Sequence, residues 1–254
     1  DESKVAEKTA KQLGAKFQKI EFSSNEVTNL FDEFISSLDQ PSNDGFNTFL
    51  ISKYVSKFVK VALTGLGADE LFGGYNFYLQ IQNSLKSQEK FFDSFLSKLH
   101  QFKRNRYTFS SNYRKLGAYD GVRDFRKLFS DLEMKQISKI KQDKYTLNHL
   151  ENVPILKQIL LSEIKQYLPN TLLRNTDNSS MANSLELRPI FLDNGILNFA
   201  MNINDDFKIN NFRQKSILID SVADLLPKEL LKEPKKGFEL PYSHWMNNEL
   251  NEIA

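Results

Sequence analysis

The strongest indication of the fold is residues 61–75, which read Val-Ala-Leu-Thr-Gly-Leu-Gly-Ala-Asp-Glu-Leu-Phe-Gly-Gly-Tyr. The apolar run Val59–Thr64 predicts a buried strand that leads directly into glycines and then into a helix. Ligands of open parallel sheets bind beyond the carboxyl ends of the strands. Glycines there let the backbone approach a ligand closely, and a helix N-terminus favours an anion. The stretch therefore predicts a phosphate site after a strand.

Two adjacent acids, Asp69 and Glu70, stand at the predicted helix start. A carboxylate at a phosphate site is well placed to hold Mg²⁺, which takes a few protein oxygens together with the phosphates of a substrate. Acids at this position also complement the helix dipole without any ligand. Both interpretations stay open, although the four glycines in residues 65–74 exceed what a structural helix start needs.

Upstream of this stretch, the pattern alternates helices and strands. Residues 2–13 predict an amphipathic helix that ends at Gly14, and Phe17–Phe22 alternates apolar and polar residues as a short strand does. A second helix is predicted to begin with Ser24 as its N-cap, and a third covers Asn47–Phe58. The order helix, strand, helix, helix, strand favours parallel pairing through crossover helices, hence an α/β sheet.

Downstream, residues 83–166 contain no convincing strand and have mostly helical spacing, as do residues 214–225 and 241–253. The predicted fold class is α/β, with a partial parallel sheet and flanking helices, followed by a mostly helical C-terminal part. Residues 1–82 are predicted to be an incomplete nucleotide-binding part, and residues 83–254 the mainly helical remainder of the same domain.

Composition excludes several classes of site. The 254 residues contain 34 Lys and Arg against 32 Asp and Glu, a net charge of +2, which gives no electrostatic case for a nucleic-acid or membrane partner. The absence of cysteine excludes disulfides, thiolate metal sites and cysteine nucleophiles within this chain. His100, His149 and His244 have no metal-ligand spacing. Because the chain begins at Asp1 and not at Met, we expect it to be part of a longer protein.

Two further polar stretches carry candidate residues. In the segment 167–193, Glu186 could face a reacting centre, whereas Arg188 and Asp193 are better explained by ion pairs that brace a loop. In residues 232–241, Lys235 lies on a loop shaped by Gly and Pro. A lysine there can neutralise charge on a transferring phosphoryl group, although most loop lysines are simply solvated. Lys215 is a weaker candidate of the same kind.

The ordered motifs resemble those of the asparagine synthetase family. Residues 61–75 resemble its second nucleotide-site signature. The downstream signature is matched by Ser180-Met181-Ala182, Glu186-Leu187-Arg188 and Phe191-Leu192-Asp193, and the final one by Lys215-x-x-Leu218, Leu226-Pro227 and Lys235-x-Gly237-Phe238-x-x-Pro241. The resemblance covers nearly the whole chain and identifies it as part of the synthetase, or ATP pyrophosphatase, domain.

This resemblance implies an adenine nucleotide alpha hydrolase-like fold and a cytoplasmic, glutamine-dependent amidotransferase of amino-acid biosynthesis. ATP and Mg²⁺ would adenylate a carboxylate, and ammonia would then form the amide and release AMP. Implied roles are Asp69 as Mg²⁺ ligand; Thr64, Gly65 and Gly67 at the nucleotide; Glu70 and Lys215 at the pyrophosphate; Lys235 at the α-phosphate; and Glu186 near the acyl-adenylate.

Departures from the family pattern leave alternatives open. The Ser-Gly-Gly-x-Asp-Ser pyrophosphate loop and the glutaminase domain with its Cys nucleophile are absent and are expected upstream of Asp1, so that this piece alone would be inactive. Leu66 stands where asparagine-forming members carry Glu. The acceptor is therefore aspartate or another carboxylate, such as a sugar acid or a cell-envelope precursor. Intramolecular closure, as in β-lactam synthetase relatives, is disfavoured because that branch has Tyr at this position. A non-catalytic, partner-binding domain and a homodimer also stay open.

Overall fold

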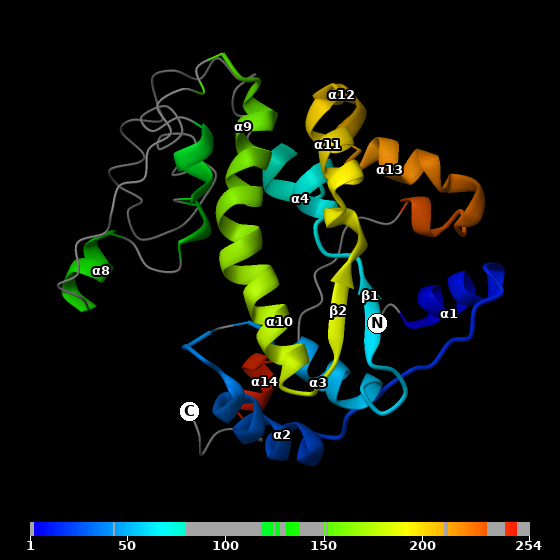
Figure 1. Cartoon of the computed structure of the whole chain (residues 1–254), viewed down its shortest axis with the longest axis vertical. Helices are drawn as coiled ribbons and strands as arrows, with labels where there is room; N and C mark the ends of the chain where they lie inside the picture. Colours follow the sequence, from blue (N-terminus) through cyan, green and yellow to red (C-terminus); the bar gives the residue numbers. More distant parts are fainter. Residues whose placement is uncertain are drawn as a thin grey trace. The chain divides into compact units, whose positions relative to one another are not determined.

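The computed structural model describes residues 3–42, 44–79, 118–123, 125–127, 131–137, 150, 152–210, 213–232 and 242–247. These residues form a mixed α/β structure that is mostly helical and has one two-stranded parallel sheet (Figure 1). The chain forms two compact units. The first comprises Asp1–Gly67, Asn170–Ile196 and Ser216–Ala254; the second comprises Ala68–Pro169 and Leu197–Lys215. The predicted boundary between residues 82 and 83 stays a prediction.

The sheet of the first unit pairs β1 (Val61–Thr64) with β2 (Glu186–Pro189), which lie side by side in Figure 1. The pairing is parallel, as predicted, and its register places Val61 opposite Glu186 and Thr64 opposite Pro189. The predicted strand over Phe17–Phe22 is wrong: these residues are in neither a strand nor a helix. Alternation predicts a half-buried extended segment, but a strand also needs a neighbouring backbone to bond with.

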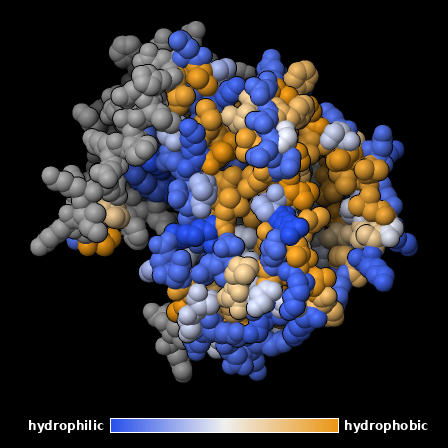
Figure 2. All heavy atoms as spheres, in the orientation of Figure 1, coloured by the Kyte–Doolittle hydropathy of each residue, from blue (hydrophilic) through white to orange (hydrophobic). Residues whose placement is uncertain are grey.

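Strand β1 is more exposed than its sequence predicts. Val61 retains 40% and Leu63 retains 71% of its accessible surface, so the expectation of a buried strand is wrong in this structure. Figure 2 shows hydrophobic side chains at the surface in the region of the sheet. An apolar run of this length predicts burial on both faces, but β1 has one hydrogen-bonded neighbour among the described residues.

The two N-terminal helices begin and end close to their predicted bounds. Helix α1 (Ser3–Gln12) is followed by Gly14 with a φ of 65°, the left-handed conformation typical of a helix C-terminus. Helix α2 (Ser24–Ser37) has Ser23 as its N-cap, one residue before the predicted Ser24. The Ser23 hydroxyl accepts from the backbone N–H of Glu26, whose carboxylate accepts from the backbone N–H of Ser23. This reciprocal capping box explains the shift, because it requires an acid three residues after the cap.

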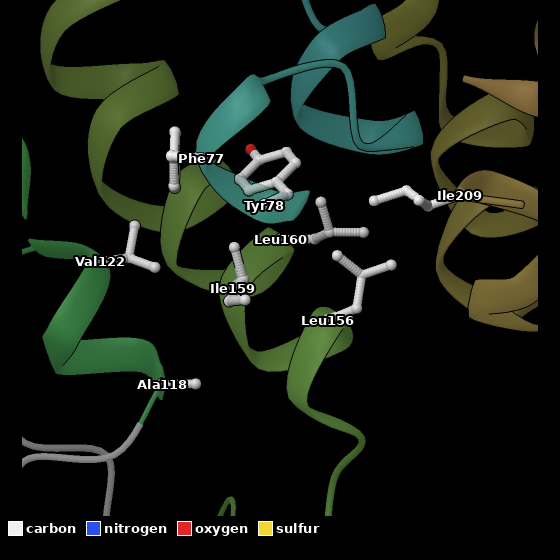
Figure 3. Packing of buried hydrophobic residues seen from close by; sticks show 8 residues of the cluster. All are labelled: Phe77, Tyr78, Ala118, Val122, Leu156, Ile159, Leu160 and Ile209. Atoms are coloured by element: carbon white, nitrogen blue, oxygen red, sulfur yellow. The ribbon is translucent and has the colours of Figure 1, made fainter. Parts of the chain in front are cut away.

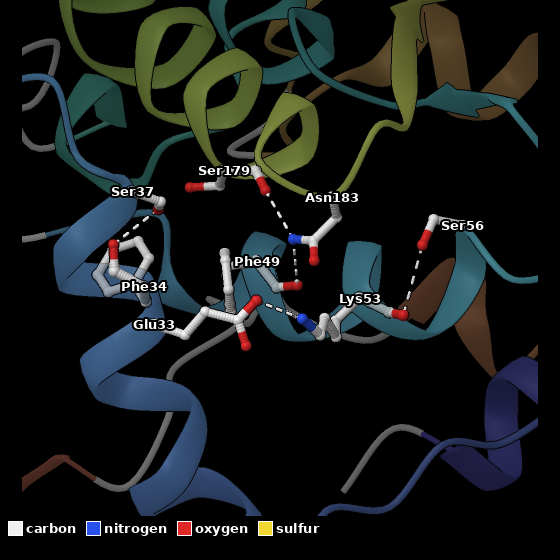
Figure 4. Close-up of polar contacts among 8 residues, drawn as sticks. All are labelled: Glu33, Phe34, Ser37, Phe49, Lys53, Ser56, Ser179 and Asn183. Carbon is white, nitrogen blue, oxygen red and sulfur yellow. Dashed lines mark hydrogen bonds and ion pairs between the residues drawn. The ribbon is translucent and has the colours of Figure 1, made fainter.

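The core of the first unit is aromatic. Helix α3 (Phe46–Val55) packs on α2 and on α10 (Arg174–Met181), and α10 also packs on β2. Figure 4 shows Asn183, just after α10, donating hydrogen bonds to the backbone oxygens of Phe49 and Ser179 at 3.3 and 3.1 Å. Buried hydrophobic side chains fill the space between the elements: Val27, Phe34, Phe46, Phe49, Leu50 and Trp245.

The core of the second unit lies around α9 (Ile155–Ser162), whose chain continues into the π-helix η1 (Glu163–Leu173). Figure 3 shows this packing. Its buried members are Phe77, Tyr78, Ala118, Val122, Leu156, Ile159, Leu160 and Ile209. The short helices α4 (Ala68–Phe72) and α12 (Asp205–Lys208) belong to the same unit. Ile209 lies next to Gly73, where an added Cβ would be 3.0 Å from the Ile209 side chain.

The remaining described elements are short, apart from α11. They are α8 (Asp131–Ile137), η2 (Ile190–Leu192), α11 (Asn194–Asn202), α13 (Ser216–Ser221), η3 (Ala223–Leu225), η4 (Leu230–Lys232) and α14 (Tyr242–Asn247). In the parts of the chain that the structure describes, no helix combines the length and apolar character needed to cross a membrane.

Candidate functional site

The turn after β1 has an open and a tightly packed glycine. Gly65 is exposed, and an added Cβ there would meet no heavy atom within 4 Å. Gly67 has a φ of 93°, a region that residues with a side chain rarely adopt, and a Cβ there would press on Leu192. The hydroxyl of Thr64 accepts a hydrogen bond from the backbone N–H of Leu66 at 3.4 Å. The turn thus has the open backbone surface at Gly65 that close approach of a ligand requires.

In the second unit, the adjacent acids of α4 have different surroundings, because neighbouring helical residues point about 100° apart. Glu70 is 2% exposed, and its carboxylate accepts a hydrogen bond from the Tyr75 hydroxyl. The Asp69 side chain is 24% exposed. Of the two acids, Asp69 is therefore the one accessible to a ligand. Helix α4 has only five residues, so its dipole adds little to anion binding.

Asp69 is paired with a lysine that is distant in the sequence. The Lys215 ammonium lies 3.1 Å from Asp69 Oδ1, and both side chains are about three-quarters buried. Gly74 closes one side of the carboxylate: an added Cβ there would be 2.7 Å from Asp69 Cγ and 3.0 Å from its Cα. The Gly74 N–H also donates to the Asp69 carbonyl oxygen at 2.9 Å. Gly74 of the motif thus makes room for the carboxylate.

We expect Gly74→Ala to destabilise the protein by about 1–3 kcal/mol, as overpacking typically does. The added methyl overlaps the Asp69 carboxylate, which has to leave its position beside Lys215. The matched control is Gly65→Ala, whose methyl meets no neighbouring atom and is expected to change the unfolding free energy by less than about 0.5 kcal/mol. Chemical denaturation of both variants measures this. Equal effects from the two substitutions would contradict the steric explanation.

The core of the second unit contains a buried ion pair, Arg126–Glu163, which lies close to Tyr75, the hydrogen-bond partner of Glu70. The guanidinium of Arg126 binds both carboxylate oxygens of Glu163, which is completely buried at the start of η1. The same guanidinium lies 3.7 Å from the ring centre of Tyr167 and 4.6 Å from that of Tyr75. Tyr75, which donates to Glu70, therefore packs against a buried cation.

The ionisation of this cluster follows from its burial. Burial raises the pKa of the Glu163 carboxyl, while the hydrogen bonds from Arg126 oppose that rise. Burial alone would lower the pKa of Arg126, but the Glu163 carboxylate outweighs it and raises the pKa. Burial and the negative charge of Glu70 also raise the pKa of Tyr75. Tyr75 is therefore a hydrogen-bond donor at neutral pH.

The sequence predicted neither the role of Arg126 nor that of Glu163. One signal was available for Glu163: the apolar face of α9 contains Leu156, Ile159 and Leu160, and the next position of that face is Glu163. An acid in an apolar stripe indicates a buried partner, because an unpaired buried charge is too costly. The periodicity of the sequence does not identify the cation that pairs with Glu163.

Glu186 lies at the other end of the sheet from the glycine turn. It is opposite Val61 at the amino end of β2, three residues before the carboxyl end at Pro189, or about 10 Å along a strand. Its carboxylate accepts from Arg188 at 2.7 Å, and both side chains are more than half exposed. Arg188 is thus in an ion pair, as predicted, but its partner Glu186 belongs to the same strand, so this pair does not brace a loop. A role of Glu186 near an acyl-adenylate stays a prediction.

Seven of the eight predicted site residues are described. In the first unit the structure brings together Thr64, Gly65 and Gly67, and in the second it brings together Asp69 and Lys215. It does not place Glu186 at the glycine turn, and Glu70 is enclosed by protein. Lys235 lies outside the described residues.

The residues present fit a magnesium ion that arrives with phosphates and not a self-contained metal centre. Among the described residues no three His, Cys, Asp or Glu side chains are grouped so that they could hold a metal. Asp69 does offer one carboxylate oxygen that already faces a cation, the Lys215 ammonium. Mg²⁺ often takes one or two carboxylates and completes its shell with water and substrate phosphates. Asp69 would hold it in that arrangement.

Comparison with known proteins agrees with the motifs. The family model for asparagine synthase matches residues 1–254. The chain is similar to asparagine synthetase [glutamine-hydrolyzing] 1 of Bacillus subtilis (30% identical, covering 98% of this chain and 42% of the relative). It is also similar to a putative asparagine synthetase of Mycobacterium bovis (26%; 95% and 39%) and to an amidase of Gibberella zeae (23%; 99% and 43%). The chain thus spans about two-fifths of the length of these relatives.

Proposed function

Because the chain belongs to the asparagine synthase family, we propose that it is the synthetase part of an ATP-dependent ligase that adenylates a carboxylate and converts it into an amide. In the first step a carboxylate oxygen attacks the α-phosphorus of ATP, the bond to the β-phosphate breaks, and pyrophosphate leaves. In the second step ammonia attacks the acyl carbon, the bond to AMP breaks, and nitrogen loses a proton. The ammonia comes from glutamine, hydrolysed by a glutaminase domain outside the 254 residues.

The observation that carries this proposal is the Asp69–Lys215 pair in the second unit, next in sequence to the glycine turn. A carboxylate and an ammonium that are 3.1 Å apart and partly exposed are suited to a metal-bound polyphosphate: the acid binds the metal and the lysine binds phosphate oxygens. When bound, Mg²⁺ neutralises the charge that develops on pyrophosphate. The chain's own residues hold and orient the phosphates.

The other roles follow the chemistry of the side chains. We assign Thr64, Gly65 and Gly67 to nucleotide binding, since Gly65 offers open backbone. Lys235 stabilises negative charge at the α-phosphate, where it develops during adenylation. Glu70 supports the pyrophosphate end through Tyr75, because its own carboxylate is enclosed.

The acceptor is the least defined part of the proposal. Leu66 occupies the middle of the Gly-Leu-Gly turn, and its side chain neither binds ammonia nor takes a proton. This residue favours a second candidate, amide formation on a carboxylate other than aspartate. Relatives of similar coverage include proteins named asparagine synthetases and proteins named amidases. A carboxylate panel is therefore part of the test.

The test is ATP–pyrophosphate exchange catalysed by the full-length protein with a panel of carboxylates that includes aspartate, sugar acids and cell-envelope precursors. We expect exchange that depends on one carboxylate, and its identity names the acceptor. A folded full-length protein that binds no ATP and supports no exchange with any acid would favour a partner-binding role instead. Omitting the carboxylate is the control for ATP hydrolysis.

A further inference from the structure

Lys215 has an unusual backbone conformation for a lysine. Its φ is 50°, in the left-handed region that residues with a side chain adopt at a cost. The preceding residue is held in the second unit, because Gln214 Nε2 donates to Asn76 Oδ1 at 3.1 Å. An ordinary surface lysine gains nothing from such a conformation, so its position requires a compensating contact. The contact that this conformation makes is the ion pair with Asp69.

Asp69 Oδ1 is closely surrounded by protein. This oxygen is buried, Gly74 stands against the carboxylate, and the Lys215 ammonium is 3.1 Å away. A divalent metal bound to the same oxygen at about 2.1 Å would face the ammonium at close range, and the two like charges repel each other. Lysine and metal are therefore alternative partners of one carboxylate oxygen.

We propose that Lys215 occupies the metal position at Asp69 until a metal-bound nucleotide displaces it. This rests on the proposed function, since the displacing group is the metal–polyphosphate substrate. On binding, Asp69 exchanges an ammonium for the metal, and the ammonium moves onto the phosphate oxygens that arrive with it. Both charges are compensated before and after the exchange. A free divalent ion brings no phosphate to receive the ammonium and is excluded, so metal and nucleotide enter together.

The proposal differs from a permanent structural ion pair in one measurable respect. A permanent pair would keep metal away from Asp69 in every state, with or without bound nucleotide. An exchangeable pair lowers the affinity for metal in the nucleotide-free protein alone. Removing the ammonium should therefore create metal binding where the wild type has little.

The experiment titrates Mn²⁺ into the nucleotide-free full-length protein and follows free Mn²⁺ by electron paramagnetic resonance. Lys215→Met is expected to bind Mn²⁺ at least 10-fold more tightly than the wild type, and Asp69→Asn in the same chain should abolish the gain. The matched control is Lys53→Met, which removes a lysine paired with Glu33 elsewhere and should leave Mn²⁺ binding unchanged. If Lys215→Met does not fold, as judged by circular dichroism, Lys215→Gln takes its place.

A second titration adds β,γ-methylene-ATP to the wild type, which should then bind Mn²⁺ as tightly as the variant does, after the Mn²⁺ chelated by the same concentration of analogue alone is subtracted. Unchanged Mn²⁺ affinity in both Lys215 variants would overturn the exchange. If the Lys215 variants gain Mn²⁺ through Asp69 but the nucleotide analogue never promotes Mn²⁺ binding to the wild type, the pair is permanent and the proposed displacement is overturned. ATP–pyrophosphate exchange by the same protein tests the proposed function separately, so the two failures are distinguishable.

Discussion

Lys235→Ala is expected to lower carboxylate-dependent ATP–pyrophosphate exchange by the full-length protein at least about 100-fold, without unfolding it. Removing one donor that stabilises transition-state charge typically costs 10²–10³-fold in rate. The substitution should leave the Kd for ATP nearly unchanged, because the charge on the α-phosphate builds up mainly in the transition state. The measurement is exchange rate at saturating ATP, together with the Kd.

The neighbouring lysine provides the control for this prediction. Lys236 is the next residue in the sequence and has the same charge, so Lys236→Ala makes an equal change in net charge. We expect it to retain exchange within a few-fold of the wild type. Normal pyrophosphate release by Lys235→Ala, or equal losses in the two variants, would remove Lys235 from the chemistry.

Arg126→Met is expected to destabilise the protein by about 3–5 kcal/mol, the usual cost of breaking a buried ion pair from one side. The substitution leaves Glu163, which is completely buried, without the two hydrogen bonds that now hold its carboxylate. It also removes the cation packed against Tyr75 and Tyr167. Urea denaturation of both proteins measures the loss.

The pH dependence of the destabilisation by Arg126→Met tests whether the unpaired charge of Glu163 causes it. Burial raises the pKa of the Glu163 carboxyl, and Arg126→Met removes the strongest opposing contacts, the hydrogen bonds and positive charge of Arg126. An acid whose folded pKa lies above its unfolded value binds more protons when folded, so its contribution to stability falls as pH rises above about 4.5. The destabilisation should therefore be smaller at pH 5 than at pH 8.

An exposed ion pair gives the matched control for Arg126→Met. Arg188 pairs with Glu186, and both side chains are more than half exposed, so Arg188→Met should lower the free energy of unfolding far less than Arg126→Met does. Adding Glu163→Gln to Arg126→Met should recover part of the loss, because it removes the stranded charge. A loss that is independent of pH and is not relieved by Glu163→Gln would point to packing instead.

The helices of the first unit could be predicted because their signals are local. The capping box of α2 lies within four residues, and Gly14 ends the helical pattern of α1 at the turn itself. Strand β2 could not be predicted in this way. Its four residues include Glu, Arg and Pro, and what makes them a strand is the ladder with β1, a partner distant in the sequence.

In the candidate site, too, the features set by local sequence could be predicted, and those set by contacts between distant residues could not. The glycine turn and the two acids could be predicted, since their residue types and spacing are contiguous in the chain. That Asp69 pairs with Lys215, while Glu70 is enclosed beside Tyr75, depends on how α4 is oriented in the second unit. Motif order supplied Lys215 as a candidate, but its contact with Asp69 depends on tertiary packing.

The long interval between β1 and β2 has a consequence for synthesis of the chain on the ribosome. Val61 pairs with Glu186, about 125 residues later, so the sheet cannot close until most of the chain has been made. At typical translation rates that interval lasts from several seconds to about half a minute. Throughout it, β1 is a nascent strand with apolar side chains and an open hydrogen-bonding edge, the kind of segment that holdase chaperones bind. We therefore expect the folding yield of this chain to depend on how well β1 is shielded while its partner is still being translated.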